Sequence, residues 1–266
     1  MPELPEVETW RRLAERTATG KTILRATTAE DRLVMDTTPP AGIAATLTGR
    51  RISGTGRKGK HMWLTFDNPG ALYLHFGMSG SLNHYAVPDH APSHEKLVLH
   101  LNDGTFLSYR NPRRIGKIRW EEDPFTAPPI AALGPDPLLD SLSEKELAAH
   151  FVGRKRAIKS TLLDQRLFAG VGNWIADEVL YQARINPHTP CGEITAAQLR
   201  QLLICLKRIL TRAVDVGADD QRFPKTWLFH HRWGKQAETD ALGNPIVFET
   251  IGGRTCAWVP SRVLDK

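Results

Sequence analysis

The sequence changes character at residues 121–140, and this change favours two dissimilar domains over one. Five prolines in this stretch interrupt any regular helix or strand: Pro124, Pro128, Pro129, Pro135 and Pro137. Short apolar and aromatic runs precede the stretch, and helical patterns follow it. A chain of 266 residues is long enough to form two domains of ordinary size, each with its own core.

The first half predicts a lead helix followed by short antiparallel strands. Apolar residues repeat with helical spacing over residues 5–18, and Gly20 follows the predicted end. Strand-like runs then occupy residues 61–66, 71–76, 96–101 and 105–109, separated by clusters of turn residues. Strands of this length and spacing are typical of a sandwich or a barrel.

The second half predicts helices and one hairpin. A capping box at Ser143 opens a helix that runs to about residue 152. Further helical patterns cover residues 158–168, 174–183 and 195–216, and strands at 246–249 and 255–259 flank a Gly252-Gly253 turn.

Composition narrows the classes of function. The chain carries 35 Lys and Arg against 29 Asp and Glu, a net charge of +6, which favours a polyanionic partner. Its three cysteines, Cys191, Cys205 and Cys256, lie far apart with no CxxC pair, which argues against a disulfide framework and a cysteine-rich zinc site. No apolar run reaches the roughly 20 residues that span a bilayer, and the start lacks a signal-peptide pattern. We therefore expect a soluble cytoplasmic protein.

The first residues carry candidate chemistry. If Met1 is removed, Pro2 becomes an N-terminal secondary amine, and an α-amino group with a pKa of about 7.7–8.0 is partly uncharged at neutral pH. Such an amine can attack an aldehyde-like carbon and form a cationic iminium, with Glu3 as the proton-transfer group. The alternative is an ordinary helix start, since Pro5 and Glu6 also suit a first helical turn.

The opening PELPEVET resembles that of the formamidopyrimidine-DNA glycosylase and endonuclease VIII family of base-excision enzymes. Four further stretches match this family in chain order: RKGK at 57–60, HFGMSG at 75–80, NPRRIG at 111–116, and residues 155–178. The resemblance implies an α+β protein. It places a catalytic antiparallel β-sandwich with its lead helix at 1–132, a linker at 133–140, a helix–two-turns–helix DNA-binding domain at 141–224, and a lesion loop with a β-hairpin finger at 225–266.

The resemblance implies that Pro2 is the nucleophile that attacks C1′ of a flipped nucleoside, and that Glu3 assists opening of the sugar ring. Lys60 reaches into the lesion pocket, and Glu6 supports the nucleophile through hydrogen bonds. Without the family context, Lys60 reads as a solvated loop lysine.

Three residues resemble those that hold the opened duplex. Met78 would fill the void left by the extruded nucleotide, since taking a base out of the stack costs a few kcal/mol. Arg113 would contact the base left unpaired opposite the lesion. Ile115 stands where many members acting on oxidised purines carry phenylalanine, so it keeps an apolar wedge but lacks a stacking face. The alternatives are a core methionine and a solvated arginine turn.

The stretch 155–178 resembles the helix–two-turns–helix motif. Its glycines permit a tight turn into a helix N-terminus, which suits a phosphate. Lys159 and Asn173 would clamp the phosphates that flank the damaged nucleotide. Glu178 has a counterpart in the family, although simple helix polarity is the alternative.

The tail departs from the family. Many members end in a four-cysteine zinc hairpin, but the corresponding positions here hold Thr239, Leu242, Val259 and Arg262. None of these side chains replaces a zinc thiolate, so we expect no metal. The sequence resembles the zinc-less finger of some members, with Arg254 at its tip gripping a DNA phosphate.

These features predict a bifunctional DNA glycosylase and abasic-site lyase that acts as a monomer, without a cofactor, on damaged double-stranded DNA at the nucleoid. The expected substrates are oxidised purines such as 8-oxoguanine and formamidopyrimidines, with strand cleavage by β,δ-elimination. Alternatives are an enzyme for oxidised pyrimidines or abasic sites, and a non-catalytic damage sensor. The joint presence of Pro2, Glu3 and Lys60 weighs against the sensor.

Overall fold

The computed structural model describes residues 2–126, 128–234 and 238–264. The chain divides into two compact units, residues 1–132 and 133–266. Each unit is described by itself. No helix among the described residues is both long and apolar enough to cross a membrane.

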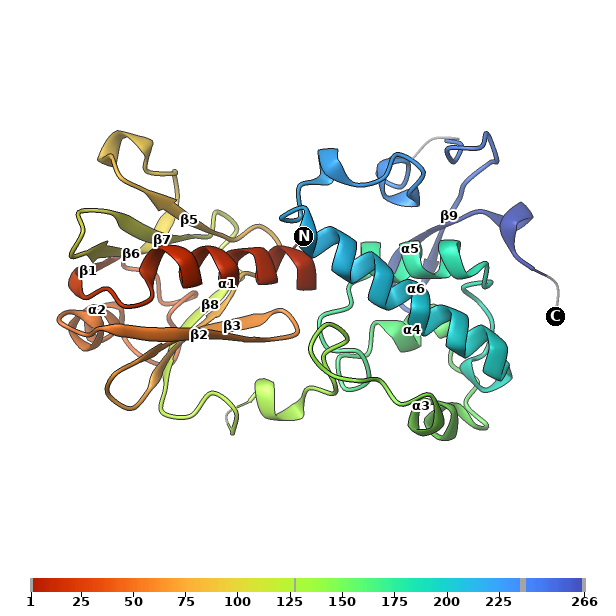
Figure 1. The fold of residues 1–266 in the computed structure, drawn as a ribbon, viewed down its shortest axis with the longest axis horizontal. Coiled ribbons are helices and arrows are strands. Elements are labelled where there is room, and N and C mark those ends of the chain that lie inside the picture. Colours follow the sequence, from red (N-terminus) through yellow and green to blue (C-terminus); the bar gives the residue numbers. More distant parts are fainter. Residues whose placement is uncertain (1, 127, 235–237, 265–266) are drawn as a thin grey trace. The chain divides into compact units, whose positions relative to one another are not determined.

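The first unit is a sandwich of two four-stranded antiparallel sheets with a lead helix (Figure 1). One sheet has the strand order β1-β6-β7-β5 and the other the order β2-β3-β4-β8. The elements of this unit are α1 (Leu4–Ala18), β1 (Ile23–Thr28), α2 (Pro40–Leu47), β2 (Ile52–Lys58), β3 (His61–Phe66), β4 (Ala71–His75), β5 (Ser81–Tyr85), β6 (Glu95–Leu101), β7 (Phe106–Arg110) and β8 (Lys117–Glu121). The predicted β-sandwich is confirmed.

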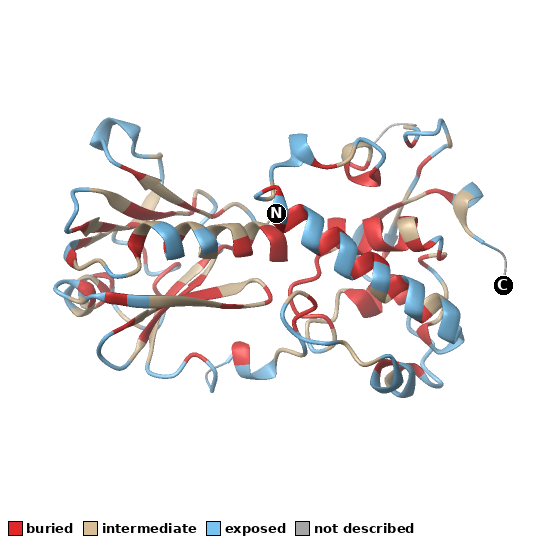
Figure 2. Ribbon diagram, in the orientation of Figure 1, coloured by how far each residue is buried: buried red, intermediate tan, exposed pale blue. Residues whose placement is uncertain are grey.

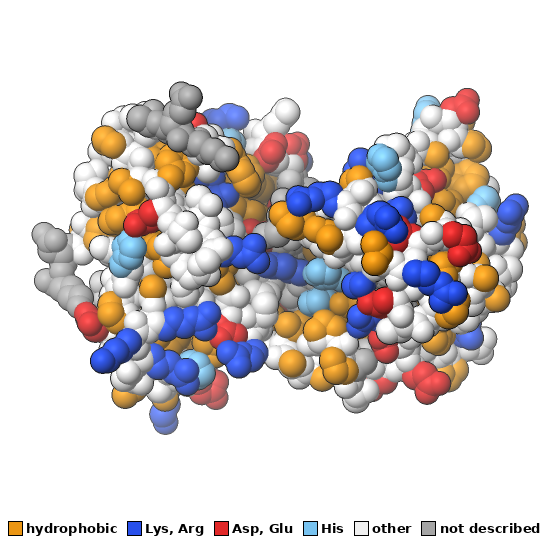
Figure 3. Space-filling view, turned by 180° about the vertical axis from the view of Figure 1, so that it is seen from behind, with side chains coloured by type: hydrophobic (Ala, Val, Ile, Leu, Met, Phe, Trp, Pro, Cys, Tyr) orange, Lys and Arg blue, Asp and Glu red, His pale blue; other side chains and the backbone are white. Residues whose placement is uncertain are grey.

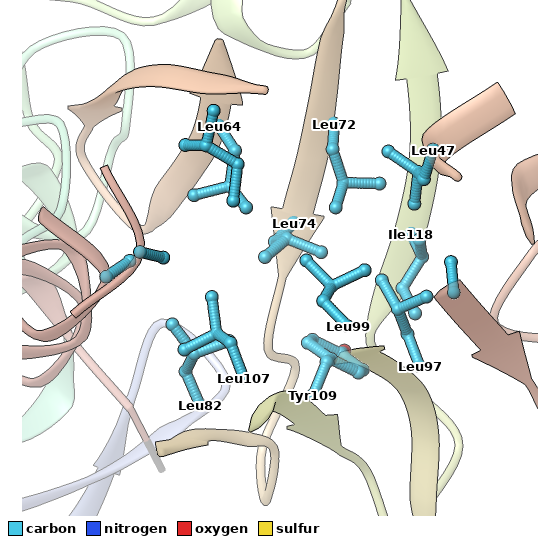
Figure 4. Close-up of a cluster of buried hydrophobic side chains, with 14 of the residues drawn as sticks. Leu47, Leu64, Leu72, Leu74, Leu82, Leu97, Leu99, Leu107, Tyr109 and Ile118 are labelled. Atoms are coloured by element: carbon cyan, nitrogen blue, oxygen red, sulfur yellow. The ribbon is translucent and has the colours of Figure 1, made fainter. Parts of the chain in front are cut away.

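Leucines from both sheets fill the interior of the sandwich (Figure 4). Leu64, Leu72 and Leu74 project from β3 and β4, and Leu99 and Leu107 face them from β6 and β7. Each of these side chains is at most 2% exposed. Burying a leucine side chain contributes roughly 1.5–3 kcal/mol, so this layer is the main stabilising element of the unit.

Helix α1 begins where the sequence predicts and packs on strands of both sheets, namely β2, β3, β5 and β7. A reciprocal capping box fixes its first turn: the Glu3 side chain accepts the backbone N–H of Glu6, and Glu6 accepts the N–H of Glu3 at 2.8 Å. Val7, Ala14 and Ala18 lie on its buried face, whereas the opposite face is exposed (Figure 2). The helix therefore holds the N-terminal residues at a fixed place beside the sandwich.

The second unit is helical with an appended hairpin. It contains α3 (Glu144–Phe151), α4 (Ile158–Leu162), α5 (Asn173–Ala183), α6 (Ala196–Asp215), β9 (Val247–Ile251) and β10 (Arg254–Trp258). Helix α6 is central to the packing of this unit. Buried and exposed residues alternate along it (Figure 2), and α3 and α5 both contact it. The predicted helical domain and β-hairpin are confirmed.

One predicted helix is too long. The pattern over 158–168 yields α4 only as far as Leu162. The side chain of Asp164 accepts the backbone N–H of Arg166 at 3.1 Å, which forms a local turn and ends the helix. The chain then runs through Gly170, with φ +91°, into α5. This turn connects α4 to α5 in the helix–two-turns–helix arrangement.

Residues 133–140, which the sequence marks as a linker, hydrogen-bond within the second unit. The N–H of Gly134 donates to the carbonyl oxygen of Gln165 at 3.0 Å, and the N–H of Ala169 donates to that of Pro135 at 3.0 Å. A Cβ on Gly134 would lie 2.1 Å from the carbonyl oxygen of Arg166, so only glycine permits this approach.

Candidate active site and nucleic-acid interface

The start of α1 brings together Pro2 and Glu3, two of the predicted catalytic residues, and Glu6, the predicted supporting residue. Pro2 is partly exposed and stands directly before the N-cap Glu3, which is 1% exposed. Burial, and then the negative charge of Glu3, raise the pKa of Glu6 to about 7. Two adjacent carboxyl groups with one near-neutral pKa can hold and exchange a proton beside Pro2.

A buried ion pair connects α1 to the turn that carries Lys60. Arg57 is 4% exposed, and its Nε donates to Oε2 of Glu8 at 2.9 Å, while its Nη1 donates to the carbonyl oxygen of Gly59 at 2.9 Å. Burial alone raises the pKa of Glu8, but hydrogen bonds from Arg11 and Arg57 outweigh this effect and lower the pKa to about 2. The sequence analysis missed this clamp.

Lys60 lies in a two-residue turn between β2 and β3. Lys58 pairs with His61 across the hairpin, and Gly59 takes the positive φ of +58° that the first position of such a turn requires. Burial, and then the charges of His75 and Lys60, lower the pKa of His61 to about 3. Burial and the charge of Lys60 likewise lower the pKa of His75 to about 4. Lys60 directly precedes His61, whose ring stacks on that of His75 with the ring centroids 4.8 Å apart, so His75 joins the candidate site.

The structure brings the two loops that carry Met78 and Ile115 together. Gly77, with φ +61°, lies so close to the backbone of Ile115 that an added Cβ would meet it at 2.8 Å. The side-chain amide of Asn111 donates to the carbonyl oxygen of Phe76 at 3.0 Å and closes the contact. Met78 is 40% exposed and Ile115 is 43% exposed, so neither is a core residue. Two exposed apolar side chains on adjoining rigid loops are suited to enter a duplex.

The structure distinguishes the two neighbouring arginines. Arg114 has φ +57°, and its guanidinium donates to both carboxylate oxygens of Asp31, at 2.9 and 3.2 Å. Arg113 is exposed beside it. Arg114 therefore holds the loop to Asp31, and the contact of Arg113 with the base opposite the lesion stays a prediction.

Lys159 is not placed as expected. It is fully buried, and its ammonium group donates to the carbonyl oxygen of Asn173 at 2.9 Å and to Oδ1 of Asp177. A side chain in this position cannot reach a DNA phosphate without breaking a buried ion pair. The predicted direct phosphate contact of Lys159 is therefore corrected: Lys159 instead fixes the first turn of α5.

Asp177 is a hub that the sequence analysis missed. Its carboxylate is buried and accepts from Lys159, from Arg232, and from the backbone N–H of Ala257 at 3.2 Å. These partners belong to α4, to the segment after the 3₁₀ turn Leu228–His230, and to β10. A single carboxylate thus connects three segments that are far apart in the sequence.

Asn173 opens α5 after Gly172, a cap residue that has no side chain to fill the helix end. Its Nδ2 donates to the carbonyl oxygen of Thr255 in β10 at 2.8 Å. An amide nitrogen has two N–H donors, and this bond uses one of them. The N-terminus of α5 and this amide together suit an anion such as a phosphate.

Glu178 lies next to Asp177 on α5 and is fully buried. Its Oε2 accepts the N–H of Phe229 at 2.9 Å, and its Oε1 accepts from Gln182 at 2.6 Å. Burial raises the pKa of Glu178 to about 7 despite these donors. Glu178 therefore supports the segment around Phe229.

Arg254 stands at the tip of the hairpin finger. It is exposed and follows the Gly252-Gly253 turn, where φ is +60° and +75°.

On the face shown in Figure 3, lysine and arginine side chains gather in several groups, with hydrophobic side chains between them. Basic groups next to apolar side chains are common on surfaces that bind nucleic acid.

Comparison with known proteins decides the family. Residues 1–118 match the model of the formamidopyrimidine-DNA glycosylase N-terminal domain, and residues 133–225 match that of its H2TH domain. The chain belongs to the formamidopyrimidine-DNA glycosylase family. It is thus a DNA glycosylase of base-excision repair.

Relatives in this family align along almost the whole chain. A formamidopyrimidine-DNA glycosylase of Arabidopsis thaliana is 40% identical over 98% of this chain and 70% of its own length. One of Methylococcus capsulatus is 39% identical over 98% of both. The Lactococcus lactis enzyme, solved non-covalently bound to DNA with an abasic site, superposes with a TM-score of 0.86 at 26% identity, covering 99% of this chain and all of the other. It was also solved with DNA containing N7-benzyl-Fapy-dG, again with a TM-score of 0.86.

Sequence reasoning missed the partners of these residues for a physical reason. Glu8 and Arg57 are 49 positions apart, and Asp177 and Arg232 are 55 apart. In the sequence each reads as an ordinary surface charge. One indirect signal in the sequence indicates that Asp177 and Glu178 have buried partners, because both lie among mostly apolar residues of α5.

Proposed function

We propose that this glycosylase removes oxidised bases, chiefly oxidised purines, from double-stranded DNA and then cleaves the strand by β,δ-elimination through an iminium at Pro2. The observation that carries the proposal is the placement of Pro2 immediately before the buried, capped Glu3 at the start of α1. Met1 itself lies outside the described residues. The chemistry requires its removal, since only then is the Pro2 nitrogen a free secondary amine.

The proposed reaction begins when the Pro2 nitrogen attacks C1′ and the C1′–base bond breaks. The bonding electrons leave on the base, which takes up the proton that the Pro2 nitrogen loses, and this loss restores the nitrogen lone pair. The C1′–O4′ bond then breaks, O4′ takes a proton from Glu3, and the nitrogen lone pair forms the C1′=N⁺ iminium. The iminium acidifies C2′, whose deprotonation expels the 3′ phosphate. A second elimination expels the 5′ phosphate.

Lys60 assists from the lesion pocket in this proposal. Its charge lies beside the neutral His61 and His75, and the clamp of Arg57 on Gly59 fixes its turn. A fixed cation near the reacting sugar can stabilise negative charge that develops on the departing base or phosphate. Met78, Arg113 and Ile115 hold the opened duplex, while Asn173 and Arg254 bind phosphates.

The preference for oxidised purines rests on two supports. The HFGMSG and NPRRIG loops resemble the oxidised-purine branch of the family, and the Lactococcus lactis relative was solved with a formamidopyrimidine-type lesion. Ile115 supplies an exposed apolar wedge but no aromatic face. We therefore infer weaker discrimination of the opposite base than in members with phenylalanine there.

A panel of labelled duplexes tests the proposal. Processed protein is incubated with duplexes that contain 8-oxoguanine, a formamidopyrimidine, an oxidised pyrimidine or an abasic site, and the products are resolved on a denaturing gel. We expect fastest cleavage at the oxidised purines, with phosphate on both ends of the gap, and none with Pro2→Gly at the base lesions. Faster cleavage of the pyrimidine or abasic duplex would reassign the substrate, and tight binding without any cleavage would indicate a damage sensor.

A further inference from the structure

The finger in this chain has no ligand set for the zinc that its resemblance to other family members implies. Among the described residues there is no group of three or more His, Cys, Asp and Glu side chains that could hold a metal ion. Val259, at one of the four aligned positions, is 3% exposed in an apolar cluster with Tyr181, Leu228, Ile246 and Ala257. Zinc thiolate chemistry does not fit these side chains. Something else must hold the finger in place.

A buried aspartate occupies the base of the finger, next to two of those aligned positions. Asp240 is 3% exposed, and its Oδ1 accepts the N–H groups of Leu242 and Asn244, each at 2.9 Å. The side-chain amide of Asn244 donates to both carboxylate oxygens at 3.1 Å. These bonds close the loop at 240–244 around a single carboxylate.

The same carboxylate reaches out of the finger to α5. Its Oδ2 accepts the hydroxyl of Tyr181 at 2.9 Å. Arg262, from the chain that leaves the finger, lies 3.9 Å from Oδ2 and has its guanidinium carbon 4.5 Å from the centre of the Tyr181 ring. Burial alone raises the pKa of Asp240, but the donors from Asn244, Leu242 and Tyr181 outweigh it, so the carboxylate is ionised at neutral pH.

We propose that Asp240, Tyr181 and Arg262 form a metal-free latch, which does for this finger what zinc does in members with four cysteines. The latch joins the incoming loop, the outgoing chain and the C-terminal part of α5. The hydrogen bonds of the latch are those that Asp240 accepts. Arg262 contributes its charge and its packing on the Tyr181 ring, since its Nε is buried without a hydrogen-bond partner among the described residues.

The finger is also hydrogen-bonded to α5 at positions nearer the start of this helix. Asn173, the first residue of α5, donates to the carbonyl oxygen of Thr255, and Asp177, in the middle of the helix, accepts the N–H of Ala257. Asn173 and Tyr181 are eight residues apart, so the attachments lie about 12 Å apart along the helix. Two separated attachments fix the direction of a hairpin, and this fixes where Arg254 is presented.

This inference rests on the proposed function in one respect: the finger matters because Arg254 grips DNA. Affinity is therefore measured for a duplex with a tetrahydrofuran abasic-site analogue, which needs binding but no cleavage. We expect Asp240→Ala to raise Kd by roughly 10- to 100-fold, as expected when a charged hydrogen-bonded group is lost, and Arg254→Ala to raise it similarly. The double variant should be no weaker than either single variant, because both remove the same contact.

Two controls separate the latch from general damage. Asp219→Asn changes an exposed aspartate in the same unit that caps only a short turn, and it should bind like the wild type. Tyr181→Phe removes one hydroxyl and keeps the ring under Arg262, so it should fold and raise Kd less than Asp240→Ala. With saturating DNA, the single-turnover rate of Asp240→Ala should match that of the wild type, because the latch lies outside the catalytic unit.

A readout without DNA keeps the latch testable if the proposed function fails. In limited proteolysis, the wild-type segment 238–262 should resist cleavage with or without a chelator, whereas in Asp240→Ala it should be cut. Additive effects of Asp240→Ala and Arg254→Ala, wild-type resistance in Asp240→Ala, or loss of wild-type affinity on adding the chelator would each overturn the latch.

Discussion

At the scale of single residues, the candidate site depends on carboxyl groups whose surroundings set their protonation. Glu3 is the N-cap of α1 and Glu6 lies in its first turn, where burial raises the pKa of Glu6 to about 7. Glu178 reaches the same value in the other unit through burial. Groups with such values respond to pH changes near pH 7.

Glu6→Gln tests this response. Folding raises the pKa of Glu6 from 4.5 to about 7, so the folded protein keeps a proton that the unfolded chain has released. The contribution of Glu6 to the free energy of unfolding therefore falls as pH rises from about 4.5 to 7 and is level above that. A glutamine side chain at this position would keep the capping box without titrating. We expect the Tm of the variant, relative to wild type, to rise between pH 5 and 7.5. An unchanged difference across this range would contradict the assigned pKa.

Lys159 offers a second test, because its two interpretations predict opposite results. If Lys159 is the buried partner of Asp177, Lys159→Ala should destabilise the protein by about 3–5 kcal/mol. If Lys159 bound a phosphate, Lys159→Ala would instead lower the salt dependence of DNA binding by about one charge. We expect a large loss in urea-unfolding free energy and an unchanged salt slope.

Lys155 is the matched control, since it lies four residues earlier and is exposed. Lys155→Ala should leave the unfolding free energy within about 0.5 kcal/mol of wild type. If Lys159→Ala were as stable as this control and its DNA binding depended less on salt, Lys159 would be a direct phosphate ligand after all.

At the scale of elements, a buried ion pair fastens α1 to the β2–β3 hairpin. The Glu8–Arg57 pair is buried, and the adjacent Arg11–Glu15 pair on the same helix is partly exposed. Removing one partner of a buried pair leaves the other charge without compensation.

Glu8→Gln should therefore lower the unfolding free energy by about 3–5 kcal/mol and slow the single-turnover reaction, because the turn that carries Lys60 loses its clamp. Glu15→Gln should change stability by less than about 1 kcal/mol and leave the rate intact. Equal effects of the two substitutions, measured by urea unfolding and rapid quench, would show that the clamp does not position Lys60.

The hairpin tip provides a paired test at two adjacent glycines. A Cβ at Gly252 would lie 2.2 Å from Oγ of Ser160 on α4, whereas a Cβ at Gly253 meets nothing within 4 Å. Both have positive φ, so alanine costs about 1–2 kcal/mol of local strain at either. Gly252→Ala should weaken DNA binding more than Gly253→Ala, because it also pushes the tip away from α4. Equal Kd values would show that the tip is not seated there.

The sequence predicts elements where the pattern is strong and misses them where it is weak. The runs at 61–66, 71–76, 96–101 and 105–109 all become strands, since their apolar residues dominate. Strand β2 contains two glycines, β5 and β8 are largely polar, and α2 contains a glycine, so none of these was predicted. Their structure comes from tertiary packing, which overrides local preference.

The candidate site shows the same division. Pro2, Glu3, Met78, Arg113, Ile115 and Arg254 could be singled out in the sequence because each lies in a recognisable local motif, and their roles stay predictions. Glu8, Asp177 and Asp240 were missed because their partners come from distant segments. Lys159 was misjudged for the same reason, since its partner Asp177 is 18 residues away.

At the scale of the whole molecule, the predicted catalytic residues lie in the unit 1–132 and the predicted phosphate contacts in the unit 133–266. Substitutions in the first unit should therefore change the single-turnover rate, and substitutions in the second unit should change the Kd for DNA. Glu3→Gln should lower the single-turnover rate at saturating DNA by roughly 100-fold or more, as for loss of a general acid, and leave Kd within about threefold. Arg254→Ala should do the reverse. A common change of rate and Kd in both variants would contradict this separation.

The most direct test of the account is chemical trapping of the iminium. Protein without Met1 is incubated with a duplex containing 8-oxoguanine, borohydride is added, and the covalent adduct is digested for mass spectrometry. The account predicts an adduct on the peptide that begins at Pro2, and none on the lesion duplex with Pro2→Gly. An adduct mapped to Lys60 or another lysine, or no adduct despite tight binding, would contradict it.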